Sequence, residues 1–199
     1  MKVAFLGLGV MGYPMAGHLK TKGGHDVTVY NRTAAKAGKW AAQFGGRSAP
    51  TPQQAAAGQD VVMCCVGNDN DLREVTLGPN GAFAGVGKGK IFVDHTTASA
   101  EIARELYAAG KKAGFDCIDA PVSGGQAGAE NGVLTVMCGG EPEPFARAEK
   151  VIAAYARACN LQGSPGSDVI QIQRLKKRKL ILRDRIRAVE DAITPDIIA

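Results

Sequence analysis

The sequence lacks an uninterrupted apolar run of the roughly 20 residues that would span a bilayer. It also lacks a C-x-x-C pair, and its five cysteines are Cys64, Cys65, Cys117, Cys138 and Cys159. Met1 and Lys2 lead directly into an apolar segment, so we expect no signal peptide. These absences favour a cytoplasmic location with reduced cysteines buried as small hydrophobic side chains. They argue against a membrane protein, a disulfide scaffold and a metal site.

A large surplus of positive charge is absent too. The net charge is +5, and residues 167–199 hold eight Lys or Arg, five Asp or Glu and no aromatic residue. Nucleic-acid binding typically needs a larger basic face, with aromatic side chains that stack on the bases. We therefore expect no nucleic-acid partner and interpret the basic residues as a solvated helix face.

Apolar segments alternate with amphipathic ones over most of the chain. The expected strands are 2–6, 26–30, 60–66, 91–93, 115–119 and 133–138. The expected helices are 11–22, 33–44, 100–113 and 142–159. This order predicts an α/β fold of the Rossmann type, a doubly wound and mostly parallel sheet with helices on both faces. Ligands of such sheets bind at the carboxyl ends of the strands.

A breaker-rich linker, Gly163-Ser164-Pro165-Gly166-Ser167, predicts a boundary between a domain at 1–163 and a segment at 164–199. Beyond it, apolar residues repeat at alternating spacings of three and four. They are Ile172, Leu175, Leu182, Ile186, Val189 and Ile193, with Lys179 in the same seam. We expect an appended amphipathic helix ending before Pro195. Because one helix cannot bury its own seam, residues 168–193 favour a homo-oligomer, a partner helix or docking on the domain.

The segment Gly7-Leu8-Gly9-Val10-Met11-Gly12 follows the first strand and precedes the first helix. This is the G-x-G-x-x-G pattern of a dinucleotide site. Gly7 permits a tight turn, Gly9 lets the backbone approach a pyrophosphate, and Gly12 lets the helix lie close to the strand. The helix N-terminus then offers N–H groups to the phosphates. The alternative is a tight turn between strand and helix with no ligand.

The second strand ends at Asn31-Arg32-Thr33, where an NAD site usually has a carboxylate for the ribose 2′-hydroxyl. A carboxylate would repel a 2′-phosphate, whereas Asn, Arg and Thr would hydrogen-bond it and Arg adds a matching charge. The sequence therefore favours NADP(H) over NAD(H). The alternative is that Asn31 or Thr33 only caps the following helix.

Three further loops are expected at strand ends: Val66-Gly67-Asn68, Asp94 to Ser99, and Ala120 to Gly125. Their small polar residues can closely approach a nicotinamide ribose or a substrate carboxylate. His95 is a candidate general base, although a histidine at a strand end is more often structural. We assign no role to His18 and His25.

Several of these motifs together resemble the β-hydroxyacid dehydrogenase family, which includes 3-hydroxyisobutyrate dehydrogenases and semialdehyde reductases. The resemblance covers residues 1–163. The motifs that carry it are Gly7 to Ala16, Asp94 to Thr97, Asp119 to Gly125 and Gly128 to Thr135.

This resemblance implies hydride transfer between NADP(H) and a small hydroxy acid, oxo acid or semialdehyde. It places the pyrophosphate on residues 7–12, which are Gly7, Leu8, Gly9, Val10, Met11 and Gly12. It places the adenosine ribose on Asn31, Arg32 and Thr33, and the nicotinamide on Val66, Gly67 and Thr97. It assigns the substrate carboxylate to Ser123, Gly124 and Gly125.

The chain departs from this family after residue 163. Members continue into a long helix whose lysine is the general acid/base, with an asparagine one turn later, and into an all-helical second domain. Extending the register places these two positions at 171–172 and 175–176, where the chain has Gln171, Ile172, Leu175 and Lys176. We therefore expect a truncated protein that turns over weakly or not at all. The alternative is a non-catalytic NADP-binding module that self-associates through its C-terminal helix.

Residues 167–199 instead resemble a small bacterial helical-hairpin family (YdcH-like). The resemblance rests on Ile172 to Leu180 and Leu182 to Ile186. A gene fusion, a frame disruption and a deliberate joining of two segments all account for such a junction.

Overall fold

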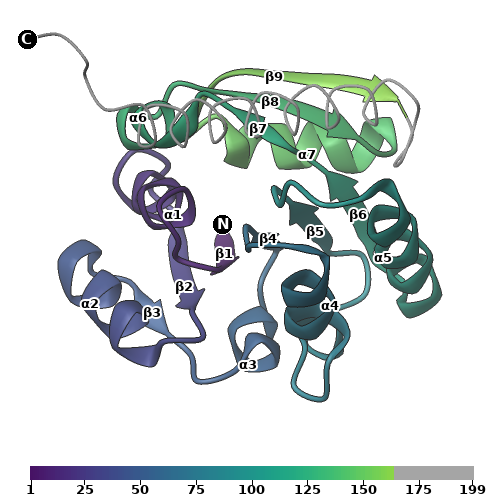
Figure 1. Ribbon diagram of the computed structural model, residues 1–199, viewed down its shortest axis with the longest axis horizontal. Coiled ribbons are helices and arrows are strands. Elements are labelled where there is room, and N and C mark those ends of the chain that lie inside the picture. The colour runs from purple at the N-terminus through teal and green to yellow at the C-terminus, as the bar shows by residue number, and fades with distance from the viewer. Residues whose placement is uncertain (164–199) are drawn as a thin grey trace, which may run out of the picture.

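The structure is a computed structural model that describes residues 1–163 (Figure 1). Its strands are β1 (Lys2–Leu6), β2 (Asp26–Tyr30), β3 (Arg47–Ser48), β4 (Val61–Cys64), β5 (Ile91–Asp94), β6 (Asp116–Asp119), β7 (Val122–Ser123), β8 (Leu134–Gly139) and β9 (Ala156–Gly163). Its helices are α1 (Gly12–Thr21), α2 (Ala34–Phe44), α3 (Pro52–Ala56), α4 (Asp69–Leu77), the 3₁₀ turn η1 (Ala82–Ala84), α5 (Ala100–Ala113), α6 (Gly125–Asn131) and α7 (Pro142–Ile152). The helix, coiled seam and self-association expected for 164–199 lie outside the described residues.

One sheet runs through the molecule in the order β3-β2-β1-β4-β5-β6-β8-β7, and β9 pairs with β8. All neighbours from β3 to β6 are parallel. From β1 the chain builds the sheet outward in one direction through β2 and β3, and from β4 in the opposite direction through β5 and β6. The boundary between β1 and β4 is therefore the topological switch point, where doubly wound sheets bind ligands. The predicted doubly wound, mostly parallel sheet is confirmed.

Alternation along the buried strands produces two hydrophobic clusters, one on each face of the sheet. In β1, Val3 and Phe5 enter the cluster covered by α1, α2 and α7. Ala4 and Leu6 enter the other cluster, which α3, α4 and α5 cover. A strand buried on both faces reads as a continuous apolar run, which explains why β1, β4 and β5 are easily recognised in the sequence.

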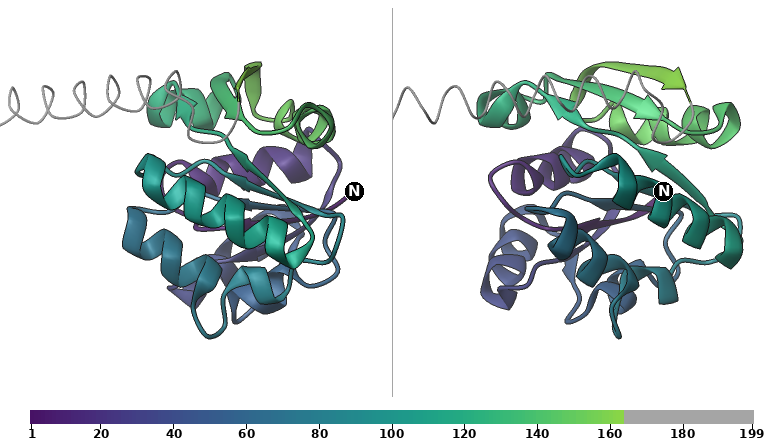
Figure 2. Two further views of the ribbon diagram at one scale, coloured as in Figure 1. Left: turned by 90° about the vertical axis from the view of Figure 1, so that its right-hand side faces the viewer. Right: turned by 45° about the vertical axis from the view of Figure 1, so that its right-hand side comes forward.

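Beyond β6 the sheet is mixed rather than wholly parallel. β8 is antiparallel to β6 and β7, whereas β9 is parallel to β8. Figure 2 shows β7, β8 and β9 running together along one side of the molecule with α6 and α7 beside them. Helix α6 contacts α1, where His18 Nε2 lies 3.1 Å from the carbonyl oxygen of Ala129 and 2.9 Å from that of Glu130.

The helix expected over 142–159 is too long. Helix α7 ends at Ile152, and residues 156–163 form the strand β9. Alanines at positions 153, 154, 156 and 158 favour a helix by propensity. Pairing with β8 overrides that preference, because residues 156–163 obtain inter-strand backbone hydrogen bonds in place of intrahelical ones.

A buried polar pair connects the start of β9 to the centre of the fold. His95 Nδ1 lies 2.6 Å from the carbonyl oxygen of Ala120, and His95 Nε2 lies 2.7 Å from the Tyr155 hydroxyl. A carbonyl only accepts, so Nδ1 donates, and in the neutral ring Nε2 accepts from the hydroxyl. Burial raises the pKa of Tyr155, which keeps the hydroxyl protonated as a donor.

Replacing Tyr155 by Phe is expected to lower the free energy of unfolding by about 1–3 kcal/mol, because His95 Nε2 would remain buried without its donor. Urea denaturation measures the change. Tyr107→Phe is the control, since that hydroxyl bonds Glu141 at the surface and its loss should cost less than about 0.5 kcal/mol. Equal effects of the two substitutions would contradict the assigned network.

Candidate functional site

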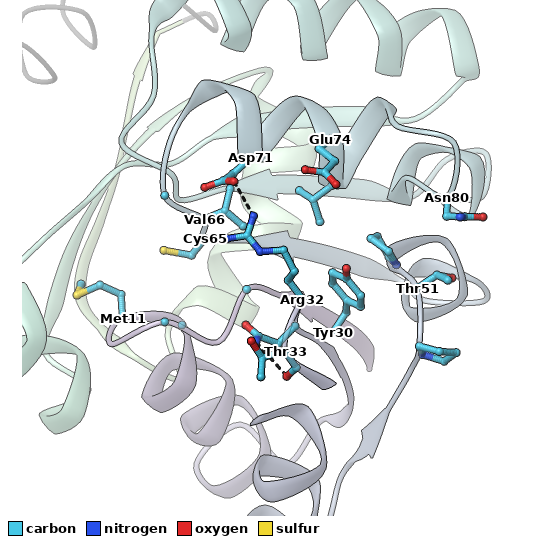
Figure 3. Close-up of a pocket in the computed structure, with 18 of the residues that line it drawn as sticks. Met11, Tyr30, Arg32, Thr33, Thr51, Cys65, Val66, Asp71, Glu74 and Asn80 are labelled. Atoms are coloured by element: carbon cyan, nitrogen blue, oxygen red, sulfur yellow. Dashed lines mark hydrogen bonds and ion pairs between the residues drawn. The ribbon is translucent and has the colours of Figure 1, made fainter. Parts of the chain in front are cut away.

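A cavity of about 670 Å³ opens at the carboxyl ends of β1, β2 and β4 (Figure 3). The predicted site residues that line it are Gly7, Gly9, Val10, Met11, Gly12, Asn31, Arg32, Thr33, Val66 and Gly67. Helix α4 and the segment around Thr51 complete the walls. Residues from three separate parts of the sequence thus meet at the switch point of the sheet.

The glycine loop is shaped by close backbone contacts. Gly7 has a φ of +92°, and a Cβ there would collide with the carbonyl oxygen of Cys65. A Cβ at Gly12 would collide with the carbonyl oxygen of Gly7 and lie 2.9 Å from the Phe5 ring. Both positions therefore require glycine for the protein's own packing.

Gly9 differs from its two neighbours in the motif. Its φ is not positive, and a Cβ built on it meets no protein atom within 4 Å. Nothing within residues 1–163 explains a glycine here, but a ligand lying against the loop would. Helix α1 begins three residues later at Gly12, and its N-cap residue Met11 makes no side-chain capping hydrogen bond. N–H groups at such a helix end attract anions.

Asn31 connects the loop to the end of β2. Its Oδ1 accepts a hydrogen bond from the Leu8 N–H at 2.9 Å, and its Nδ2 donates to the Thr33 carbonyl at 3.2 Å. Asn31 therefore holds the loop in place as well as lining the cavity. The Leu8 side chain is fully buried and lies outside the cavity lining.

Thr33 is the N-cap residue of α2, yet its side chain makes no capping hydrogen bond. Its hydroxyl is thus not engaged by the helix whose start it marks. Arg32 reaches across the cavity, where its guanidinium forms an ion pair with Asp71 of α4 at 3.0 Å (Figure 3).

Further side chains connect the loops that follow β4, β5 and β6. The Thr96 hydroxyl accepts a hydrogen bond from the Val66 N–H at 3.1 Å. His95 connects the β5 loop to Ala120, as described above. Beneath these loops, burial and the nearby Asp94 carboxylate raise the pKa of the Cys64 thiol, which keeps that thiol protonated.

Of the residues expected at the nicotinamide, Val66 and Gly67 line the cavity, whereas Thr97 and the residues expected at the substrate lie outside its lining. Thr97 is half-buried in the loop between β5 and α5. Ser123, Gly124 and Gly125 are exposed at the turn from β7 into α6, where Gly124 and Gly125 have φ of +131° and +62°. The structure therefore gathers the residues expected at the pyrophosphate and the adenosine ribose, apart from Leu8, into one cavity with Val66 and Gly67. It places the residues expected at the substrate on a separate, exposed turn.

Sequence reasoning missed the wall formed by α4. Asp71 and Glu74 project from this helix into the cavity (Figure 3). The available signal was Asn68, whose side chain accepts from the Asp71 N–H at 3.0 Å and thereby caps α4. An Asn three residues before an Asp predicts such a helix start at the strand end.

Among the described residues, no helix is long and apolar enough to cross a membrane. All five cysteines lie within the described residues and none forms a disulfide. The Cys138 and Cys159 sulfur atoms lie 3.6 Å apart on adjacent strands.

Comparisons with known proteins agree with this geometry. An uncharacterized oxidoreductase from Shewanella frigidimarina is 60% identical over 166 residues, which cover 83% of this chain and 57% of that protein. The structure of Mycobacterium tuberculosis 3-hydroxyisobutyrate dehydrogenase with L-serine superimposes with a TM-score of 0.81 at 30% identity, covering 95% of this chain and 62% of that one. Psf3 in complex with NADP⁺ and 2-OPP gives a TM-score of 0.79 at 30% identity, covering 87% and 60%.

The chain therefore spans about three fifths of the length of these three proteins. Residues 2–163 match the family model described as the NAD binding domain of 6-phosphogluconate dehydrogenase. With the switch-point cavity and the glycine loop in place, the chain belongs to this family of NAD-binding domains.

Proposed function

We propose that residues 1–163 form a domain that binds NADP(H) in preference to NAD(H), as the cofactor half of an oxidoreductase. Gly9 carries this proposal, because an open glycine beside the uncapped N-terminus of α1 fits a bound pyrophosphate. The α1 N–H groups and the backbone of Gly7 to Gly12 would hold the two phosphates. A bound nicotinamide would supply or accept the hydride.

The remaining residues take roles around this anchor. Arg32 and Thr33 would bind the 2′-phosphate, while Asn31 keeps the glycine loop beside them. Val66, Gly67 and Thr97 would line the nicotinamide side. Ser123, Gly124 and Gly125 would offer hydroxyl and backbone N–H donors to a substrate carboxylate. The relative named 3-hydroxyisobutyrate dehydrogenase and the NADP⁺ complex support a small hydroxy acid, oxo acid or semialdehyde as substrate.

Turnover is expected to be weak. Gln171 and Ile172 stand where the family resemblance implies the lysine that exchanges a proton with the substrate. General acid–base catalysis typically contributes about 10²–10⁴-fold to a rate. We keep a non-catalytic NADP-binding module as the second candidate, with 164–199 as a separate segment that self-associates. A cytoplasmic location fits five cysteines that form no disulfide.

Gly9→Ala is expected to weaken NADPH binding by about tenfold or more, equivalent to 1.4 kcal/mol, because the new methyl group would occupy the pyrophosphate position. Stability should not change, since no protein atom lies near. NADPH fluorescence titration and thermal denaturation measure the two effects. Gly38→Ala, an equally open glycine on α2, is the control and should bind normally. Unchanged binding by Gly9→Ala would contradict the proposed pyrophosphate position.

Arg32→Ala is expected to lower the affinity for NADPH by about tenfold, in the range of a charge-assisted hydrogen bond, with a smaller effect on NADH. The matched control is Arg73→Ala, which breaks an exposed arginine–carboxylate pair with Glu105 outside the cavity. Parallel titrations with NADPH and NADH separate the effects. An equal loss of affinity for NADPH and NADH would show that Arg32 does not bind the 2′-phosphate.

The chain is expected to oxidise NADPH with glyoxylate or succinic semialdehyde at least about 100-fold more slowly than ordinary dehydrogenases, whose kcat is near 10 s⁻¹. Absorbance at the nicotinamide band follows the reaction. A rate near 10 s⁻¹ that Ser123→Ala abolishes, while Ser48→Ala on β3 does not, would overturn the prediction of weak turnover.

A further inference from the structure

Arg32 already has an anionic partner within the cavity. Its guanidinium extends from the β2–α2 connection to the Asp71 carboxylate on the facing wall, 3.0 Å away (Figure 3). The two side chains are 78% and 27% exposed, so a ligand entering the cavity can reach the arginine. The carboxylate therefore lies where a phosphate on the ribose would approach Arg32.

The Asp71 carboxylate is held in this direction by its own helix. Its Oδ2 accepts a hydrogen bond from Asn68 Nδ2 at 3.0 Å, which leaves Oδ1 for Arg32. The same Oδ2 lies against the backbone of Gly67, where a Cβ would be only 2.8 Å away. The first turn of α4 thus presents a fixed carboxylate to Arg32.

Asp71 acts oppositely on the two cofactor forms. A 2′-phosphate competes with the Asp71 carboxylate for Arg32 and is repelled by its charge. A 2′-hydroxyl can instead donate a hydrogen bond to a carboxylate, which is the interaction that acidic residues make in NAD sites. Asp71 therefore offsets part of the preference that Arg32 creates.

We propose that Asp71 is a specificity-determining residue that reduces discrimination between NADP(H) and NAD(H). Its carboxylate neutralises the charge of Arg32 and accepts a hydrogen bond from the ribose 2′-hydroxyl of NAD(H). This inference rests on the proposed function, because it requires the adenosine ribose to lie beside Arg32. The preference for NADP(H) then reflects competition between a phosphate and a resident carboxylate for one guanidinium group.

Asp71→Asn tests the proposal, since it keeps the shape and the hydrogen bond from Asn68 but removes the charge. We expect it to tighten NADPH and 2′,5′-ADP binding about two- to fivefold, the range of an exposed ion pair. Binding of NADH and 5′-AMP should stay equal or weaken. Calorimetric titration at low and high salt gives the four affinities, and the gain should shrink at high salt.

Glu74→Gln is the matched control. Glu74 lies on the same helix and projects into the same cavity, and its substitution removes the same charge without touching the Arg32–Asp71 pair (Figure 3). A smaller change in the NADPH-to-NADH affinity ratio is expected. In an Arg32→Ala background, Asp71→Asn should tighten NADPH binding less than it does when Arg32 is present, because only the direct repulsion between carboxylate and phosphate is then relieved.

The outcomes separate the two claims. If the unmodified chain binds both cofactors but Asp71→Asn alters their ratio no more than Glu74→Gln does, the specificity role is wrong and the proposed function stands. A gain in NADPH affinity that is undiminished in the Arg32→Ala background overturns the competition mechanism. If the unmodified chain binds neither cofactor nor 2′,5′-ADP, the proposed function fails, and this inference with it.

Discussion

Side-chain hydrogen bonds between successive loops hold together the carboxyl edge of the sheet. Asn31 accepts a hydrogen bond from a backbone N–H of the glycine loop, and Thr96 accepts one from a backbone N–H of the loop after β4. His95 donates a hydrogen bond to the carbonyl oxygen of Ala120, which follows β6. Parallel strands bring these loops to one edge, where backbone hydrogen bonds such as that from the Gly7 N–H to the Tyr30 carbonyl also join them. The side-chain bonds add to these in fixing the relative positions of the loops. Tyr155 extends the network into β9, so the site depends on a residue far from it in sequence.

Much of this architecture follows from local signals. Residues 2–6, 26–30 and 100–113 were predicted with the bounds that the structure gives, because continuous apolar runs and capped amphipathic segments are unambiguous. Strand β9 was not predictable, since its alanines favour a helix and only pairing with β8 makes it a strand. Short elements such as β3 and β7 likewise depend on a partner strand rather than on their own two residues.

In the site, too, some features follow from local sequence signals and others depend on tertiary contacts. Turn chemistry predicted the glycine loop, and the positive φ of Gly7 and the contacts of Gly12 agree with the roles assigned to them. The Arg32–Asp71 pair joins residues 39 positions apart, so no spacing rule could indicate it. Asn31, predicted to contact the cofactor, lines the cavity, and its amide also hydrogen-bonds the backbone of Leu8 and Thr33. This second role becomes visible only once β1 and β2 are adjacent. Tertiary contact therefore determines how the predicted residues are used.

Titration of the purified chain with NADPH and, separately, with NADH tests the central claim most directly. The account predicts that both cofactors bind and that NADPH binds more tightly, because Gly9 and the α1 N-terminus serve both while Arg32 acts on the 2′-phosphate alone. If a chain shown to be folded bound neither NADPH nor NADH, that result would contradict the account.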